Sequence, residues 1–243
     1  MKAFILAAGL GSRLGELTKD MPKALVQLNG MALLGRLINY LKGQGFDHFL
    51  VNIHHHGQMV VDYLKNNKNF DVQIEISDER SELLDTGGAI LKARHFFKGN
   101  QPVLIHNVDI ISEVNLKKML SHHLNNNALA TLCVRRRDTD RSLVFDDKMV
   151  LKGWKNKKTD EYKWVDAPLS NYLSLAYSGI YFADPGFPDQ LTLNGKFSII
   201  DGWLTLATPD LIRGYMDSSE NWFDLGTKEK LQIAETYLKS RQS

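Results

Sequence analysis

The sequence has few of the features that mark secreted, membrane-bound or nucleic-acid-binding proteins. Its only cysteine, Cys133, cannot form an internal disulfide. The 30 basic residues nearly balance the 28 acidic ones, and a formal net charge of +2 predicts no attraction to nucleic acid or to a membrane surface. No apolar run approaches the roughly 20 residues that span a bilayer, and the N-terminus lacks a signal-peptide pattern. We therefore expect a cytoplasmic protein that binds neither nucleic acid nor membrane.

In its first half, the sequence alternates short apolar runs with segments whose apolar residues recur at helical spacing. Residues 3–8, 49–53 and 103–105 are short apolar runs and predict buried strands, whereas leucine and isoleucine recur at helical spacing over residues 33–41. Strands alternating with helices favour an α/β fold with a parallel sheet covered on both faces. The same patterns predict strands at 72–76, 129–134 and 172–182 and helices at 58–64, 88–97, 114–124 and 227–238.

The second half of the sequence is less regular. Residues 143–145 and 149–154 predict a hairpin, and the polar stretch 156–170 predicts a long loop, whose role the sequence does not define. No linker of distinct composition divides the chain. We therefore predict one domain that covers residues 1–243.

The strongest sign of a binding site is LAAGLGSRL at residues 6–14, followed by MPKALV at residues 21–26. Small residues at the end of a buried strand let the backbone approach a phosphate closely, and glycines allow the dihedral angles that such a loop needs. Arg13 and Lys23 would add positive charge. A dinucleotide-binding fingerprint is incomplete here, because Leu14 stands where its third glycine would be.

Three further segments carry candidate ligand-binding residues. In LDTGGAI at residues 84–90, Asp85 or Thr86 can cap a helix, and the glycines permit close backbone contact with a ring or an anion. In VLIHNVD at residues 103–109, an apolar strand ends in Asp109, a candidate metal ligand. NWFDLGT at residues 221–227 precedes the last predicted helix.

Together these segments resemble the sugar-1-phosphate nucleotidyltransferases, whose opening pattern is roughly LAAGxGxRLxPLT followed by PKPLV. Glu16 and Ala24 stand where that family usually has proline, and Val108 replaces a usual glycine beside the nucleotide or acceptor. The resemblance implies a Rossmann-like nucleotide-diphospho-sugar transferase fold with a central, mostly parallel mixed sheet and helices on both faces. It also implies a nucleotide-binding half at about residues 1–127 and a sugar-phosphate-binding half at about residues 128–243.

The same resemblance implies a role for each motif residue. Asp109 and Asp224 would hold Mg²⁺, with Arg13, Lys23 and Asp109 as the catalytic residues. The acceptor would contact Asn107 and Gly179, the latter in an SGIY segment at residues 178–181 that is similar to the family's. The implied nucleotide-binding residues are Leu6, Ala7, Ala8, Gly9, Gly11, Ser12, Arg13, Lys23, Thr86 and Gly87.

The implied reaction joins a nucleoside monophosphate from a nucleoside triphosphate to a sugar 1-phosphate and releases pyrophosphate. The LDTGG and WFDLGT segments are most similar to those of the short N-acetylmuramic acid 1-phosphate uridylyltransferases of peptidoglycan recycling, so UTP is the expected donor. A mannose- or heptose-1-phosphate guanylyltransferase is the near alternative. A catalytically inactive nucleotide-binding regulator and a dinucleotide-dependent oxidoreductase are alternatives of other classes. The sequence does not define the oligomeric state.

Overall fold

The structure, a computed structural model, describes residues 1–208 and 210–241 and has the predicted α/β class with a mixed sheet. The chain forms two compact units, each assembled from segments that are separate in the sequence. Unit 1 contains residues 1–83, residues 106–113 and the C-terminal segment from Ser219. Unit 2 contains residues 84–105 and 114–218. That residues 1–243 act as one domain, with halves divided near residue 127, stays a prediction.

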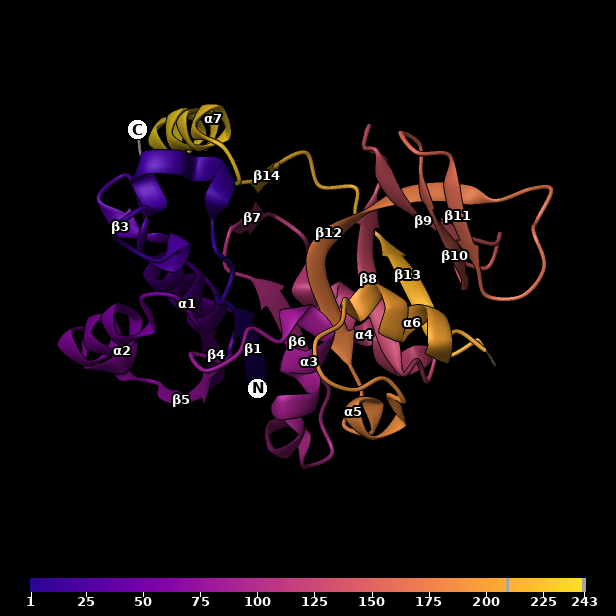
Figure 1. Cartoon of the computed structure of the whole chain (residues 1–243), viewed down its shortest axis with the longest axis horizontal. Helices are drawn as coiled ribbons and strands as arrows, with labels where there is room; N and C mark the ends of the chain where they lie inside the picture. Colours follow the sequence, from indigo (N-terminus) through magenta and orange to yellow (C-terminus); the bar gives the residue numbers. More distant parts are fainter. Residues whose placement is uncertain (209, 242–243) are drawn as a thin grey trace. The chain divides into compact units, whose positions relative to one another are not determined.

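Three of the predicted strands, at residues 3–8, 49–53 and 72–76, form parallel pairs within unit 1. β1 (Lys2–Leu6) pairs in parallel with β4 (His48–Ile53), which pairs in parallel with β5 (Gln73–Asp78) (Figure 1). The helices α1 (Leu33–Gly43) and α2 (Gly57–Asn66) connect them. The apolar side chains of α1 recur at helical spacing, so one face of this helix is buried and the other remains polar.

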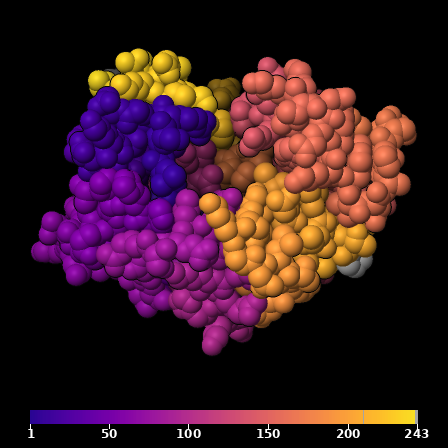
Figure 2. Space-filling model, in the orientation of Figure 1, coloured from indigo at the N-terminus to yellow at the C-terminus, as the bar shows by residue number. Residues whose placement is uncertain are grey.

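Unit 1 is completed by segments from the middle and the end of the chain. β6 (Val103–Asn107) enters it at His106, and β7 (Ile110–Ser112) pairs antiparallel with β14 (Trp222–Asp224). Helix α7 (Lys228–Ser240) lies on the N-terminal segment (Figure 2), where the Asn29 side chain donates to the Glu235 carbonyl at 3.2 Å. The short elements are η1 (Ser12–Thr18), η2 (Lys23–Leu25), β2 (Gln27–Leu28), β3 (Met31–Ala32) and η3 (Lys68–Asp71).

Antiparallel pairing is more frequent in unit 2. β12 (Leu173–Ala183) pairs antiparallel with both β8 (Ala130–Arg135) and β9 (Arg141–Phe145), while β13 (Ile212–Met216) pairs in parallel with β8. The core is aromatic, since the fully buried rings of Tyr181 and Trp203 meet edge to face at 5.1 Å. The helical segments are α3 (Asp85–Lys92), η4 (Arg94–Phe97), α4 (Leu116–Asn125), α5 (Phe187–Gln190) and α6 (Ile199–Leu206).

Two predicted elements differ in the structure. The helix predicted at residues 88–97 starts earlier, at Asp85, and is interrupted between α3 and η4. The loop predicted at residues 156–170 contains β11 (Glu161–Trp164), which pairs antiparallel with β10 (Leu151–Asn156). Stacked rings of Tyr162 and Trp164, with centroids 5.9 Å apart, pack on this strand. Along the described residues, no helix combines the length and apolar composition needed to cross a membrane.

Candidate active site

Two buried polar side chains hold the end of β1 in place. The Asn52 Oδ1 atom accepts hydrogen bonds from the backbone N–H groups of Ala7 at 2.6 Å and Ala8 at 3.1 Å. The Asn52 amide in turn donates to Glu79 Oε1 at 2.8 Å. Because both side chains are buried, the bonds that they make are shielded from water and fix the point where the glycine-rich loop begins.

The loop after β1 presents backbone hydrogen-bond donors for which the described residues offer no acceptor. In the described part of the chain, the backbone N–H groups of residues 9–13 have no hydrogen-bond acceptor. Gly11 has a left-handed φ of 67°, and its carbonyl accepts from the Thr18 hydroxyl at 3.0 Å. A Cβ atom on Gly11 would lie 2.9 Å from Thr18 Cγ2 and 3.1 Å from Lys23 Cβ. The loop therefore needs glycine in order to pack against the stem of Lys23, with Ser12 and Arg13 exposed.

Asp109 and Asp224, which come from distant parts of the sequence, lie side by side. Asp224 ends β14 opposite Ile110 of β7, and the next residue, Leu225, donates its N–H to the Asp109 carbonyl at 2.8 Å. Both carboxylates are largely buried, with 18% and 20% of their side chains exposed. The Leu6 carbonyl accepts from Val108 N–H at 3.1 Å, which joins the Asp109 segment to the end of β1.

Each of these two carboxylates has its own lysine. Lys23 Nζ forms an ion pair with Asp109 Oδ2, and Lys230 Nζ lies 3.0 Å from Asp224 Oδ2. Burial raises the pKa of Asp224, but the hydrogen bond and charge of Lys230 outweigh it and, with smaller contributions from Arg13 and Lys23, hold that pKa below its ordinary value. Asp224 is therefore ionised at neutral pH.

The Arg13 guanidinium lies against the turn that follows Asp224. A Cβ atom on Gly226 would lie 2.8 Å from Arg13 Nη2 and 2.9 Å from Asp224 Oδ1. A side chain at position 226 would therefore displace the Arg13 guanidinium and the Asp224 carboxylate from their places on the two sides of this turn. Unit 1 thus contains all four residues to which the sequence assigns catalysis or metal binding, namely Arg13, Lys23, Asp109 and Asp224.

The donor set in unit 1 fits Mg²⁺ bound together with phosphates. Mg²⁺ prefers oxygen ligands, and in nucleotide enzymes it is usually held by one or two carboxylates together with substrate oxygens and water. Asp109 and Asp224 supply such a pair. Among the described residues no group of three or more histidine, cysteine or acidic side chains could hold a metal ion. The arrangement therefore matches a metal that arrives with its phosphates rather than one enclosed by protein ligands alone.

Thr86 and Gly87, predicted to bind nucleotide, belong to unit 2 and have structural partners there. Thr86 Oγ1 accepts from the Ile199 N–H at 2.9 Å, and the Gly87 N–H donates to the Phe197 carbonyl at 2.9 Å. A Cβ atom on Gly87 would lie 2.2 Å from the Phe197 ring. Within the described residues, α3 has no side-chain cap: Asp85 Oδ1 accepts from the adjacent Thr86 N–H, and the Thr86 hydroxyl is used by Ile199.

The two predicted acceptor residues lie in different units. Gly179 of unit 2 has a φ of 80° where the register of β12 against β8 shifts, so a glycine is favoured there by the backbone. Asn107 of unit 1 ends β6, and its carbonyl accepts from His106 Nδ1 at 2.8 Å. Burial lowers the pKa of His106 to about 4, so this ring is neutral at pH 7.

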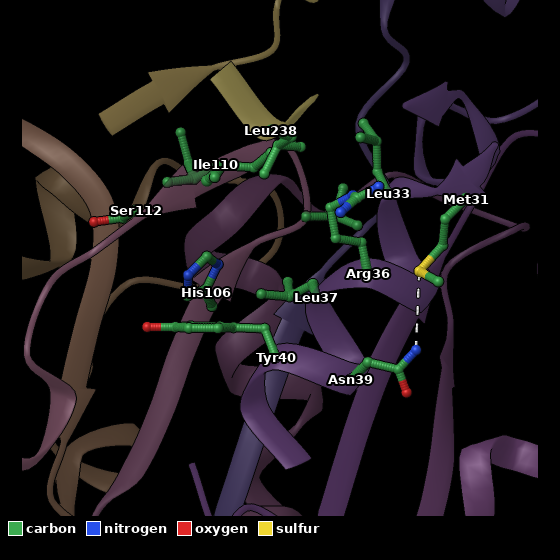
Figure 3. A pocket seen from close by; sticks show the side chains of 12 residues that line it. Met31, Leu33, Arg36, Leu37, Asn39, Tyr40, His106, Ile110, Ser112 and Leu238 are labelled. Atoms are coloured by element: carbon green, nitrogen blue, oxygen red, sulfur yellow. Dashed lines mark hydrogen bonds between the residues drawn. The ribbon is translucent and has the colours of Figure 1, made fainter. Parts of the chain in front are cut away.

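A cavity of about 420 Å³ in unit 1 adjoins the Asp109 segment (Figure 3). Its lining is mainly apolar, with Leu37 from α1, Ile110 from β7 and Leu238 from α7. Val108, which stands where the family usually has glycine, also lines this cavity and is 6% exposed. Its side chain therefore packs into the cavity wall. The cavity has the wrong chemistry for a triphosphate, because Arg36 is the one cationic side chain in its lining and donates to the Leu28 carbonyl.

Sequence reasoning missed three residues that shape the site, namely Asn52, Glu79 and Lys230. Asn52 interrupts an otherwise apolar strand, and Glu79 directly follows β5, so both carry a weak signal of polar groups at strand ends. Lys230 carries none, because a lysine in an amphipathic helix usually faces solvent. The contact with Asp224 could be found only from the position at which α7 begins.

Comparison with known proteins places these features in a family. The family model described as nucleotidyl transferase matches residues 2–241. N-acetylmuramate alpha-1-phosphate uridylyltransferase of Caulobacter vibrioides is 40% identical over 111 residues, covering 45% of this chain and 46% of that protein. D-glycero-alpha-D-manno-heptose 1-phosphate guanylyltransferase of Campylobacter jejuni is 32% identical over 141 residues, covering 58% and 61%. In both alignments the chain spans less than two thirds of the relative's length.

Solved structures agree on the fold. HddC from Yersinia pseudotuberculosis, in a complex with GMP-PN, has a TM-score of 0.78 and 21% sequence identity to this chain. The match covers 98% of this chain and 99% of that one. At this level of identity the likeness confirms the Rossmann-like fold.

Proposed function

This chain belongs to the nucleotidyl transferase family, and from that premise we propose that it transfers a nucleoside monophosphate from a nucleoside triphosphate to a sugar 1-phosphate. The observation that carries the proposal is that Asp109 and Asp224 lie on adjoining segments of unit 1, which also holds the N–H donors of residues 9–13, for which the described residues offer no acceptor. Carboxylates, cations and backbone donors in this combination suit phosphate chemistry. A regulator without catalysis would not need them all.

In this proposal the chain supplies position and charge. The donors of residues 9–13 and the Arg13 guanidinium bind the phosphates that leave as pyrophosphate. Lys23, with 8% of its side chain exposed, stabilises negative charge on the α-phosphate or on the acceptor phosphate during in-line attack. Asp109 and Asp224 hold Mg²⁺, which when bound neutralises phosphate oxygens. A sugar 1-phosphate is already largely dianionic at pH 7, so no side chain has to act as a general base.

The proposal also assigns substrate contacts to residues of unit 2. We assign Thr86 and Gly87 to the nucleoside and Gly179, together with Asn107 of unit 1, to the sugar phosphate. The Thr86 hydroxyl already accepts a hydrogen bond from Ile199, so the nucleoside contact proposed here uses backbone atoms of this turn.

UTP and N-acetylmuramic acid 1-phosphate are the substrates that we propose, with a role in peptidoglycan recycling. The support is the uridylyltransferase of Caulobacter vibrioides, which aligns with 45% of this chain at 40% identity. Mannose- or heptose-1-phosphate guanylyl transfer is the second candidate, because relatives with those names align over larger shares of the chain at lower identity. Nucleoside triphosphates and sugar phosphates are cytoplasmic metabolites, and a cytoplasmic location is part of the proposal.

Pyrophosphate release tests the proposal directly. UTP, GTP, CTP, ATP and dTTP would each be combined with a panel of sugar 1-phosphates, with Mg²⁺ and then with EDTA. We expect release with UTP and N-acetylmuramic acid 1-phosphate that EDTA abolishes. Release with GTP and a mannose or heptose 1-phosphate would keep the reaction and replace the substrates. A folded protein that binds nucleotide and releases no pyrophosphate from any pair would contradict the proposed transferase activity.

A further inference from the structure

Lys230 holds a position that the stability of its own helix does not explain. It lies in the first turn of α7, where Thr227 accepts its N–H and caps the helix. The N-terminus of a helix carries partial positive charge, which disfavours a lysine there and favours an anion such as Glu229. The contact that compensates is outside the helix, because Lys230 Nζ reaches back to Asp224 Oδ2 at 3.0 Å.

The two lysines next to the carboxylate pair differ in how firmly they are held. Lys23 sits on η2 with 8% of its side chain exposed, so separating it from Asp109 would leave a nearly buried charge. Lys230 has 43% of its side chain exposed on a flexible stem, so its ammonium can return to water at small cost. Of the two ion pairs, only the one at Asp224 is easy to open.

The charge balance shows what opening this pair would do. Asp109 and Asp224 contribute two negative charges, and three cations, Lys23, Lys230 and Arg13, act on them. A divalent metal that enters without phosphates meets a site that is already positive. When a triphosphate is present, its negative charges attract both the metal and the lysine. The metal therefore gains access to Asp224 most readily together with the phosphates.

We propose that Lys230 is an exchangeable counter-ion of Asp224, which competes with the divalent metal and so makes metal binding depend on the nucleotide. This positioning role rests on the proposed function. It deepens that function because competition from Lys230 would weaken the binding of metal alone and favour the binding of metal together with nucleotide. By linkage, the same residue sets how strongly the metal and the nucleotide promote each other's binding.

Mn²⁺ titration of the purified protein, without nucleotide and followed by electron paramagnetic resonance, tests this role. In Lys230→Gln the competing charge is gone, and we expect Mn²⁺ alone to bind about tenfold more tightly than in wild type. The strengthening of Mn²⁺ binding by a nucleoside triphosphate should fall by about the same factor. Lys230→Arg keeps the charge and should resemble wild type.

Two controls separate this role from a general effect of charge or of folding. Lys228→Gln removes an exposed lysine from the same turn of α7, and we expect it to leave Mn²⁺ affinity close to wild type. In an Asp224→Asn background, Lys230→Gln should no longer change Mn²⁺ affinity, because its partner carboxylate is gone. Thermal unfolding of each variant checks folding, and Lys230→Met, which keeps the apolar stem, replaces Lys230→Gln if that protein is unstable.

The outcomes distinguish this inference from the function on which it rests. If wild type releases pyrophosphate while Lys230→Gln and Lys228→Gln have equal Mn²⁺ affinities, the role of Lys230 is wrong and the transferase stands. The same holds if Lys230→Gln binds Mn²⁺ less tightly than wild type. If no variant binds Mn²⁺ with or without nucleotide, and wild type releases no pyrophosphate from any pair, the proposed function fails as well.

Discussion

A Cβ atom added at Gly9 of unit 1 would meet no atom within 4 Å, whereas one added at Gly87 of unit 2 would lie 2.2 Å from the Phe197 ring. Both glycines stand in segments whose sequence predicts nucleotide binding. Only Gly87 is required by the packing of the protein itself. Gly9 lies exposed, in a loop whose N–H donors of residues 9–13 have no acceptor in the described chain, so its lack of a side chain favours a ligand.

The two units also differ in what their buried polar groups hold. Unit 1 buries Asn52 and Glu79 beneath the glycine-rich loop and brings Asp109 and Asp224 together on adjoining segments. Unit 2 also buries polar side chains, among them His123 and Asp217, in a core that includes the fully buried Trp203. Buried polar groups are costly unless they are paired, and in unit 1 their pairing fixes the segment from which the glycine-rich loop starts.

Among variants that test the difference between the two units, we expect the largest loss of activity from a change in unit 1. Asp224→Asn removes one of the two proposed metal carboxylates, and we expect pyrophosphate release to fall by about 10²- to 10³-fold. Stability should change little, since Lys230 is 43% exposed and can be solvated without its partner. A rate assay beside urea unfolding measures both quantities. Activity within a few-fold of wild type would contradict the role given to Asp224.

A matched pair of glycine variants tests the comparison itself. Gly87→Ala should lower the free energy of unfolding by about 2 kcal/mol, because the clash with Phe197 outweighs the roughly 1 kcal/mol that alanine gains in a helix. Gly9→Ala should change that free energy by less than about 0.5 kcal/mol. It should nevertheless weaken nucleotide binding, measured by calorimetry. The reverse pattern, an unstable Gly9→Ala and a stable Gly87→Ala, would break the comparison.

Acid should destabilise unit 2 through a buried histidine. Burial lowers the pKa of His123 to about 4, and its Nδ1 is 2.9 Å from Thr131 Oγ1. Because the unfolded pKa is about 6.5, the unfolded chain binds the proton first, and stability is lost as pH falls from 6.5 toward 4. We expect a loss of about 2 kcal/mol between pH 7 and pH 5 from this residue.

His123→Asn cannot gain that proton and serves as the comparison for urea unfolding at the two pH values. His106 of unit 1, with a pKa also lowered to about 4, should leave a remaining dependence of similar size. An unchanged pH dependence in His123→Asn would show that His123 is not the group that responds.

The smallest expected effect concerns the attachment of α7 in unit 1. Hydrogen bonds from Tyr237 and Asn221, together with Arg241, outweigh burial and lower the pKa of Glu113. Glu113→Gln should therefore cost less than about 1 kcal/mol at pH 7, since the site is near the surface. A group with a lowered pKa loses its contribution as pH falls through that pKa, so the difference between variant and wild type should shrink toward pH 4 in thermal unfolding.

Sequence patterns predicted most of the elements of unit 1 because burial imposes them. β4 and α1 show apolar residues at strand and helix spacing, and the structure places them within a few residues of the predicted positions. β11 was missed, because an exposed strand with aromatic residues on a polar background has no such alternation. Patterns of this kind report burial, and they say little about strands that stay at the surface.

The candidate site was predictable only in part. Residues 6–14 and Asp109 stand out, since they follow buried strands. The pairing of β14 with β7 joins residues far apart in the sequence, and no local pattern reports it. Asn52 and Lys230 act through contacts with other segments, so their roles appear only when those segments are in place.

The pairing of β7 with β14 has a consequence for synthesis of the chain. Trp222–Asp224 are translated long after Asp109, and without them Asp109 lacks its neighbouring acidic residue. A nascent chain that stops earlier can form β1, β4 and β5 and the glycine-rich loop, but not the complete carboxylate pair. The proposed metal site can therefore assemble only after β14 has been synthesised and has paired with β7.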